Sequence, residues 1–151
     1  MQYLGGKSRL GRNIVQAILD DLSLSSLGDV VDLCAGAGGA TRWLADVSTK
    51  VYAIEKHPGL VAMHKAIQCG KWLPPMSVSE EDYARLRREG LTEDPLTAFA
   101  EFGCSFGGKS WGGYARTVAG NAAARNYAMN ARNALLRDTR TNVEFLCDDA
   151  L

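Results

Sequence analysis

The sequence has no excess of charge of either sign, no closely spaced cysteines and no long apolar run. Its 17 Lys and Arg residues balance 17 Asp and Glu residues, so net charge indicates no class of partner. The four cysteines are too widely spaced for a metal-ligand motif or a disulfide scaffold, and we expect reduced, mostly buried thiols. No secretory leader opens the sequence and no apolar run approaches membrane-spanning length, so we expect a cytoplasmic protein without a metal.

What is present is a regular alternation of helix and strand patterns. The 151 residues, 46% of them apolar, suit one globular domain or most of one. Hydrophobic periodicity and capping residues predict helices at 9–22, 58–68, 80–89, 95–102 and 126–137, a helix that starts near residue 41, and strands at 30–34, 51–54 and 143–147. This order predicts an α/β fold with an open, mostly parallel sheet.

A glycine-rich turn follows the first predicted strand and is the first candidate ligand site. Asp32 precedes the run CAGAGGA, residues 34–40, which we call the glycine turn; Gly36 and Gly38 let the backbone approach a ligand closely. Glu55 ends the next strand, where an acid of doubly wound folds accepts hydrogen bonds from ribose. Position 41 is Thr where a dinucleotide fingerprint has Gly, which favours S-adenosylmethionine over NAD. A purely structural turn is the alternative.

Both ends of the sequence carry further candidate ligand residues. Residues 1–7, which we call the N-terminal segment, offer an aromatic face, two glycines and a cation suited to a carboxylate: Tyr3, Gly5, Gly6 and Lys7. Asp148 and Asp149 follow the last predicted strand, at the carboxyl edge where ligands of open α/β sheets bind. One of the two could accept a hydrogen bond from an adenine amino group, and two solvated acids are the alternative.

The run GCSFGGKSWGGYAR, residues 103–116, fits no helix or strand period, and we call it the glycine-aromatic segment. It combines π-faces and cations that suit a nucleic acid: Phe106, Lys109, Trp111, Tyr114 and Arg116. From residue 103 to residue 140 six basic residues accompany one acid, Asp138. A packed loop with aromatic anchors, followed by a solvated helix face, would give the same pattern.

Taken in order, the motifs YLGGKSRL, VVDLCAGAGGAT, FGCSFGGKSWGGYAR and NVEFLCDDAL resemble the DNA adenine-N6 methyltransferases of the Dam-like class, particularly their phage and prophage members. The resemblance implies a class I S-adenosylmethionine-dependent methyltransferase sheet of Rossmann-like type that acts on double-stranded DNA in a bacterial cytoplasm. It implies a cofactor-binding part at 1–78, a target-recognition region at 79–140 and a return to the sheet at 141–151.

The resemblance also assigns roles to single residues. Those implied to bind the cofactor are Tyr3, Gly5, Gly6, Lys7, Asp32, Gly36, Gly38, Glu55 and Asp149. Those implied to contact DNA are Phe106, Lys109, Trp111, Tyr114, Arg116 and Arg125.

One departure from the family concerns catalysis. The Asp-Pro-Pro-Tyr motif, which would activate a flipped adenine, is absent, because Pro74-Pro75 lies between Leu73 and Met76. The family carries this motif one strand further on, so we expect the N-terminal part of a truncated or split enzyme. We expect it to be inactive alone, with a second chain as one source of the catalytic half. The alternatives are a non-catalytic DNA- or cofactor-binding module and a small-molecule methyltransferase that shares only the cofactor fold.

Overall fold

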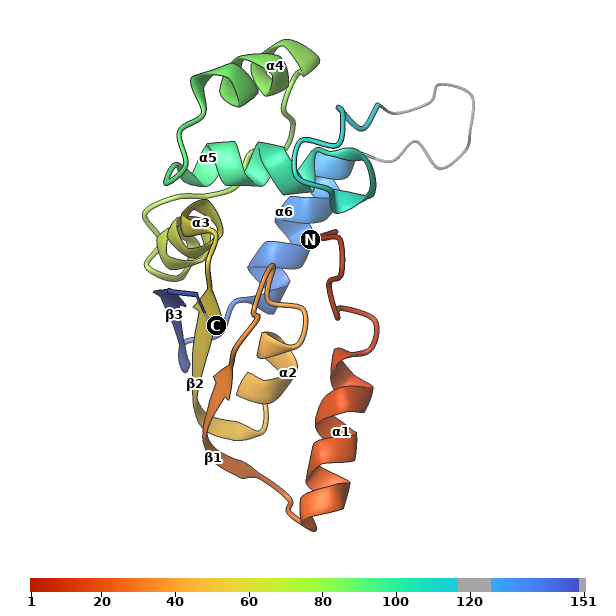
Figure 1. Cartoon of the computed structure of the whole chain (residues 1–151), viewed down its shortest axis with the longest axis vertical. Coiled ribbons are helices and arrows are strands. Elements are labelled where there is room, and N and C mark those ends of the chain that lie inside the picture. The colour runs from red at the N-terminus through yellow and green to blue at the C-terminus, as the bar shows by residue number, and fades with distance from the viewer. Residues whose placement is uncertain (117–125, 150–151) are drawn as a thin grey trace.

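The computed structural model describes residues 1–116 and 126–149, which form an α/β arrangement with a three-stranded parallel sheet (Figure 1). The strands, in sheet order, are β1 (Leu27–Asp32), β2 (Ser48–Glu55) and β3 (Val143–Cys147). The helices are α1 (Gly11–Leu22), α2 (Thr41–Ala45), α3 (Pro58–Gln68), α4 (Glu80–Glu89), α5 (Pro95–Ala98) and α6 (Tyr127–Asp138). The predicted α/β class with a parallel sheet is confirmed, and the arrangement is compatible with a Rossmann-like fold.

Local capping explains why several predicted helices begin where they do. The Ser79 hydroxyl accepts a hydrogen bond from the Asp82 N–H at 3.0 Å and caps α4, whose first turn is acidic and whose last turn is basic. The His57 ring caps α3, and Pro58 occupies its first turn. β1 was expected at 30–34 but begins at Leu27, because its pairing with Ser48 and Lys50 of β2 draws the preceding residues into the sheet.

The helix predicted at 95–102 is only partly α-helical. After the four residues of α5 the chain continues as a π-helix, η1 (Phe99–Gly103). Glu101 lies inside this turn and is only 6% exposed. π-Helical turns are rare and often occur at functional sites, because the extra residue redirects a side chain.

One face of the sheet is covered and the other is open. Val51 and Ala53 of β2 and Phe145 of β3 are buried beneath α2 and α3. On the opposite face Val31 is 56% exposed, and Leu33, just after β1, is 59% exposed. Parallel sheets are normally covered on both faces, so the exposure of these two side chains is unusual for a parallel sheet.

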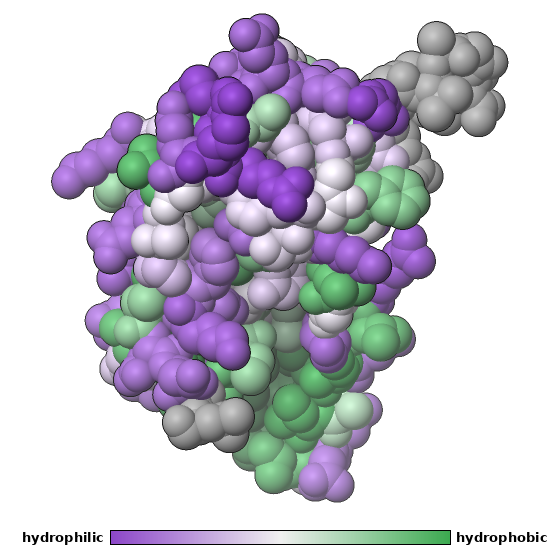
Figure 2. All heavy atoms as spheres, turned by 45° about the horizontal axis from the view of Figure 1, so that its top comes forward, coloured by the Kyte–Doolittle hydropathy of each residue, from purple (hydrophilic) through white to green (hydrophobic). Residues whose placement is uncertain are grey.

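The outer edge of β1 is also unpaired in the part of the chain that the structure describes. Leu27 and Ala35 donate their N–H groups toward β2, at 2.7 Å to Val47 and 3.0 Å to Ile54. Because N–H groups alternate along a strand, those of Gly28 and Val30 point to the open edge. In Figure 2 apolar surface gathers at the lower right, in the region of α1 and β1, and the exposed apolar side chains of α1 are Ile14, Ile18 and Leu22.

A second apolar core lies above the sheet and joins α3 to the helices of the upper part (Figure 1). Leu60 and Met63 of α3 pack with Phe99 of η1, and all three are fully buried. Leu86 of α4 and Leu135 of α6 belong to the same cluster. The predicted cofactor-binding and target-recognition parts therefore share one core.

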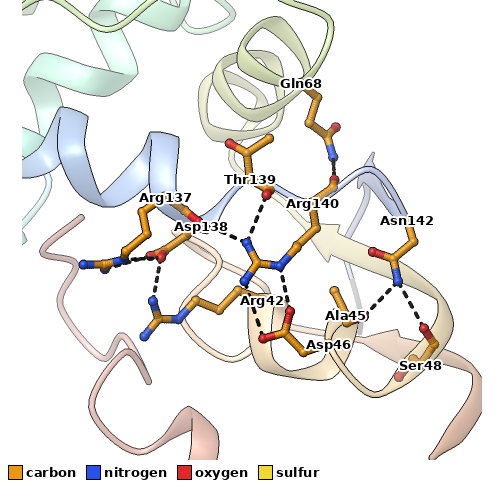
Figure 3. A network of polar contacts seen from close by, with 10 residues as sticks. All are labelled: Arg42, Ala45, Asp46, Ser48, Gln68, Arg137, Asp138, Thr139, Arg140 and Asn142. Carbon is orange, nitrogen blue, oxygen red and sulfur yellow. Dashed lines mark hydrogen bonds and ion pairs between the residues drawn. The ribbon is translucent and has the colours of Figure 1, made fainter.

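Polar contacts fix α6 and the start of β3 beside α2 and α3 (Figure 3). Arg42 of α2 pairs with Asp138 of α6 at 2.5 Å, and the Arg140 guanidinium donates to Asp46 at 2.7 Å. The Gln68 amide donates to the carbonyls of Arg140 and Val143. These bonds, of which the two arginine–carboxylate contacts are charge-assisted, set the direction in which the chain enters β3.

The cysteine prediction is wrong in one respect. All four thiols are free, but only Cys104 is buried, and burial raises its pKa to about 12. Cys34, Cys69 and Cys147 are exposed, because Cys34 and Cys69 follow β1 and α3 and Cys147 is the last residue of β3, so none of them lies inside a core. Within residues 1–116 and 126–149, no helix is both long and apolar enough to cross a membrane.

Candidate functional site

A groove of about 470 Å³ lies between the N-terminal segment, α1, β1 and the glycine turn. Six of the nine predicted cofactor residues line it: Tyr3, Gly5, Gly6, Lys7, Asp32 and Gly36. Apolar side chains of α1 and β1, such as Ile14 and Val30, form the rest of its wall. The groove thus combines an apolar body with a few polar groups, as small-molecule sites do.

Close backbone approach explains the glycines of this groove. A Cβ atom on Gly36 would lie 2.9 Å from the Tyr3 ring, and the residue has a φ of +53°. A Cβ atom on Gly39 would lie 2.8 Å from the Ser8 nitrogen. Glycine is therefore required for the N-terminal segment to pack on the glycine turn, and this packing brings two separately predicted motifs together.

The two predicted cofactor carboxylates brace the glycine turn. One Glu55 oxygen accepts the N–H of Gly36 and the other accepts the N–H of His57, both at 2.8 Å. One Asp32 oxygen accepts the Thr41 hydroxyl at 2.7 Å. A carboxylate oxygen can accept more than one hydrogen bond, so bracing the turn leaves capacity for a ribose hydroxyl.

Lys7 has a local partner although it lines the groove, and two further predicted cofactor residues, Gly38 and Asp149, do not line it. Lys7 is exposed and donates to the Gly5 carbonyl at 2.7 Å. Gly38 lies against His64 rather than in the groove wall, with a φ of +75°. Asp149 is exposed and follows Asp148, whose N–H donates to the Glu55 carbonyl at 3.3 Å. Both acids therefore lie at the carboxyl end of the sheet, where β2 ends, but they do not line the groove.

The glycine-aromatic segment is a closed hairpin-like loop, which the sequence pattern did not indicate. An antiparallel bridge joins Ser105 to Tyr114, and the Phe106 N–H donates to the Gly113 carbonyl at 2.9 Å. The loop touches the groove's own wall, because the Leu4 N–H donates to the Gly108 carbonyl at 3.0 Å. Gly108 has no room for a side chain there: a Cβ atom would lie 2.6 Å from the backbone of the N-terminal segment.

The predicted DNA-contacting residues divide into anchors and exposed side chains. Trp111 packs edge-on against Tyr83 with ring centres 5.1 Å apart, and the Tyr114 hydroxyl donates to the Val78 carbonyl at 2.7 Å. Phe106 is 68% exposed and Lys109 is exposed at the loop tip. Arg116 is exposed and forms an ion pair with Glu80, whereas Arg125 lies outside the described residues.

Three polar residues that were not among the predicted site residues meet beside the groove: His57, Glu101 and Ser110. The Ser110 hydroxyl donates to one Glu101 oxygen at 2.6 Å, and the other oxygen lies 3.2 Å from His57 Nε2. The hydrogen bond to Glu101 raises the pKa of His57. Burial alone would raise the pKa of Glu101, but its bonds to His57 and Ser110 lower it. The available signal was Glu101 itself, a lone acid in an otherwise apolar stretch.

His64 supports the glycine turn from below. Its ring stacks on Phe145 of β3 with ring centres 4.2 Å apart, and its Nε2 atom has no hydrogen-bond partner within the described residues. Burial lowers the pKa of His64 to about 4. The ring is therefore neutral at physiological pH.

A scan against known protein families found no match, and a search of curated proteins found no similar sequence. The assignment of a function therefore depends on the sequence motifs and on the geometry described above.

Proposed function

We propose that this chain carries the cofactor-binding and DNA-contacting parts of an S-adenosylmethionine-dependent DNA adenine-N6 methyltransferase with a class I sheet. The observation that carries the proposal is the groove itself. Residues from the N-terminal segment and the glycine turn, which the resemblance assigns to one cofactor, line the same wall. Lys7, in the groove wall, would meet the methionine carboxylate; Glu55 and Asp149, which do not line the groove, would meet the ribose and the adenine at the carboxyl ends of the strands.

The position of the glycine-aromatic segment supports a DNA substrate over a small molecule. The segment hydrogen-bonds to the N-terminal segment beside the groove, and it presents Phe106, next to the closing bridge, and Lys109, at the tip, to solvent. An exposed aromatic ring next to a cation suits an unstacked base and its phosphate. A flipped adenine would have to come close to the methyl donor, which agrees with this adjacency.

The residues that would activate the adenine are not among these 151 residues, so the proposed chemistry needs a further polypeptide segment. The outer edge of β1 supports this, because no residue within 1–116 and 126–149 pairs with its outward N–H groups, which can therefore pair with another strand. Such a strand would cover the apolar part of the groove wall, formed by α1 and β1, and would leave the polar end at the N-terminal segment and the glycine turn for the cofactor. A second chain is one source of that segment.

Binding of S-adenosylhomocysteine, measured by titration calorimetry, tests the proposal. We expect the wild-type chain to bind it more tightly than NAD. Lys7→Ala should weaken binding about tenfold, because a hydrogen bond to a charged group contributes about 1.4 kcal/mol. Lys71→Ala is the matched control, since Lys71 is an exposed lysine outside the groove.

Two results would contradict the cofactor assignment. One is the absence of S-adenosylhomocysteine binding by the wild-type chain. The other is equal affinity in the Lys7→Ala and Lys71→Ala variants, which would place the ligand away from the N-terminal segment.

A further inference from the structure

His57, Glu101 and Ser110 form a polar cluster between three segments: the start of α3, the π-helix η1 and the glycine-aromatic segment. Glu101 is only 6% exposed, and each of its carboxylate oxygens has a partner, Ser110 at 2.6 Å and His57 at 3.2 Å. Its backbone carbonyl accepts the Trp111 N–H at 3.3 Å. A buried carboxylate with this many bonds holds its neighbours in one geometry.

The order of the three side chains differs from that of a Ser-His-acid triad. The Ser110 hydroxyl donates to Glu101 and not to His57, whereas the serine of such a triad donates to the histidine. His57 Nδ1 accepts the Leu60 N–H at 3.3 Å, so the neutral ring carries its proton on Nε2, which faces Glu101. The cluster is therefore suited to holding segments in place.

The cluster is continuous with the candidate cofactor site. Glu55 accepts the N–H groups of both His57 and Gly36, so the same carboxylate touches the cluster and the glycine turn. The Phe102 ring, next to Glu101, lies 5.1 Å from the rings of both His57 and Tyr3, measured between centres. A displacement of Glu55 or Tyr3 is transmitted to Glu101 through these contacts.

We propose that Glu101 and Ser110 are positioning residues that couple cofactor binding to the conformation of the glycine-aromatic segment. The inference rests on the proposed function, because it takes the groove as the cofactor site and the segment tip as the DNA-contacting surface. A ribose that shares Glu55 fixes the glycine turn and His57, and His57 then fixes Glu101. Glu101 holds the tip through Ser110 and the Trp111 N–H, so the tip is ordered before DNA arrives.

The coupling is measured as the change in DNA affinity that the cofactor product causes. The full chain is titrated with a fluorescently labelled adenine-containing duplex, with and without saturating S-adenosylhomocysteine. We expect DNA affinity to rise about fivefold in its presence, within the usual range for coupled sites. By reciprocity, DNA should raise the affinity for S-adenosylhomocysteine by the same factor.

Ser110→Ala removes the link between the Glu101 carboxylate, which His57 contacts, and the tip. The bond from the Trp111 N–H to the Glu101 backbone carbonyl stays, and Ser110→Thr keeps the hydroxyl. Ser110 is exposed and does not line the groove, so the Ala variant should fold and bind S-adenosylhomocysteine as the wild-type chain does in the absence of DNA. We expect the fivefold effect to disappear in Ser110→Ala and to return in Ser110→Thr. Ser77→Ala, at another exposed serine, should retain it. If Ser110 had a merely structural role, Ser110→Ala would instead lower the affinities for DNA and for S-adenosylhomocysteine. S-adenosylhomocysteine would then still raise DNA affinity by the same factor.

The possible failures are distinguishable. If the wild-type chain binds both ligands but their affinities are independent, or if Ser110→Ala keeps the full effect, the coupling is overturned and the proposed function stands. If the wild-type chain binds neither ligand, the proposed function fails and the coupling fails with it.

Discussion

Single residues of the glycine-aromatic segment have two distinct tasks. Trp111 and Tyr114 are anchors, because one packs against Tyr83 and the other donates to the Val78 carbonyl. Phe106 and Lys109 carry no such contact within the described residues and extend from the tip. Substitution of the anchors would therefore report on stability, whereas substitution of the tip residues reports on binding.

Lys109→Ala should weaken DNA binding and reduce its dependence on salt. If Lys109 neutralises one phosphate, the slope of log affinity against log salt concentration should fall in magnitude by about 1. Fluorescence anisotropy with a short duplex at several salt concentrations measures this slope. Lys71→Ala serves as the control, and an unchanged slope in Lys109→Ala would remove this residue from the DNA interface.

At the scale of elements, the two histidines of the chain support neighbouring structures with opposite pKa shifts. His57 caps α3 and pairs with Glu101, which raises its pKa. His64, two turns further along α3, stacks on Phe145 of β3, and burial lowers its pKa to about 4. The contribution of protonated His57 to the free energy of unfolding is present at low pH and is lost as the pH rises through its pKa in the folded state. Stability that depends on His64 is lost as pH falls.

Acid should destabilise the chain through His64. Between its ordinary pKa of 6.5 and about 4, the unfolded state binds a proton that the folded state does not. The free energy of unfolding should therefore fall by about 3 kcal/mol over this range from His64 alone. Urea unfolding at pH 7 and at pH 4.5, followed by circular dichroism, measures the loss.

The contribution of His64 is isolated by comparing variants, because carboxylates titrate in all of them. His64→Gln should lose clearly less stability on acidification than the wild-type chain. His57→Gln should retain the full acid loss, since the pKa of His57 is shifted in the opposite direction. Equal acid sensitivity in wild type and His64→Gln would show that His64 is not protected from protonation.

At the scale of the whole molecule, the dominant feature is the open side of the sheet. In the part of the chain that the structure describes, the outer N–H groups of β1 have no strand partner. The adjacent sheet face exposes Val31, and α1 exposes Ile14 and Ile18 beside it. Exposed apolar surface next to an unpaired strand edge favours association with another polypeptide.

We expect the isolated chain to self-associate through this side. Ile18→Lys should lower the association measured by sedimentation velocity over a concentration series, at little cost in stability, because Ile18 is already 37% exposed. Leu73→Lys is the control, since Leu73 is 61% exposed and lies outside the groove. If both variants associate like the wild-type chain, the open side is not the contact surface.

Local patterns in the sequence were sufficient for most elements and for part of the candidate site. Ser79 and Pro58 marked helix starts correctly, and the glycine turn was located because only glycine permits its close backbone contacts. Tyr3, Lys7 and Gly36 were also predicted to serve one site, and they line one groove. These features depend on neighbours along the chain or on backbone conformation, which residue types report directly.

Tertiary structure alone decided how the segments meet. The hairpin closure of residues 103–116, the π-helical turn at Glu101 and the contacts of Glu101 with His57 and Ser110 leave no periodic pattern in the sequence. The exposure of three cysteines, against the prediction, follows from which ends of the strands and helices remain uncovered. The sequence by itself determined the α/β order and the glycine turn, because helix and strand formation is governed by local periodicity and capping. Packing between distant segments decided the polar cluster and the open edge of β1, because such contacts depend on the complete arrangement of the chain.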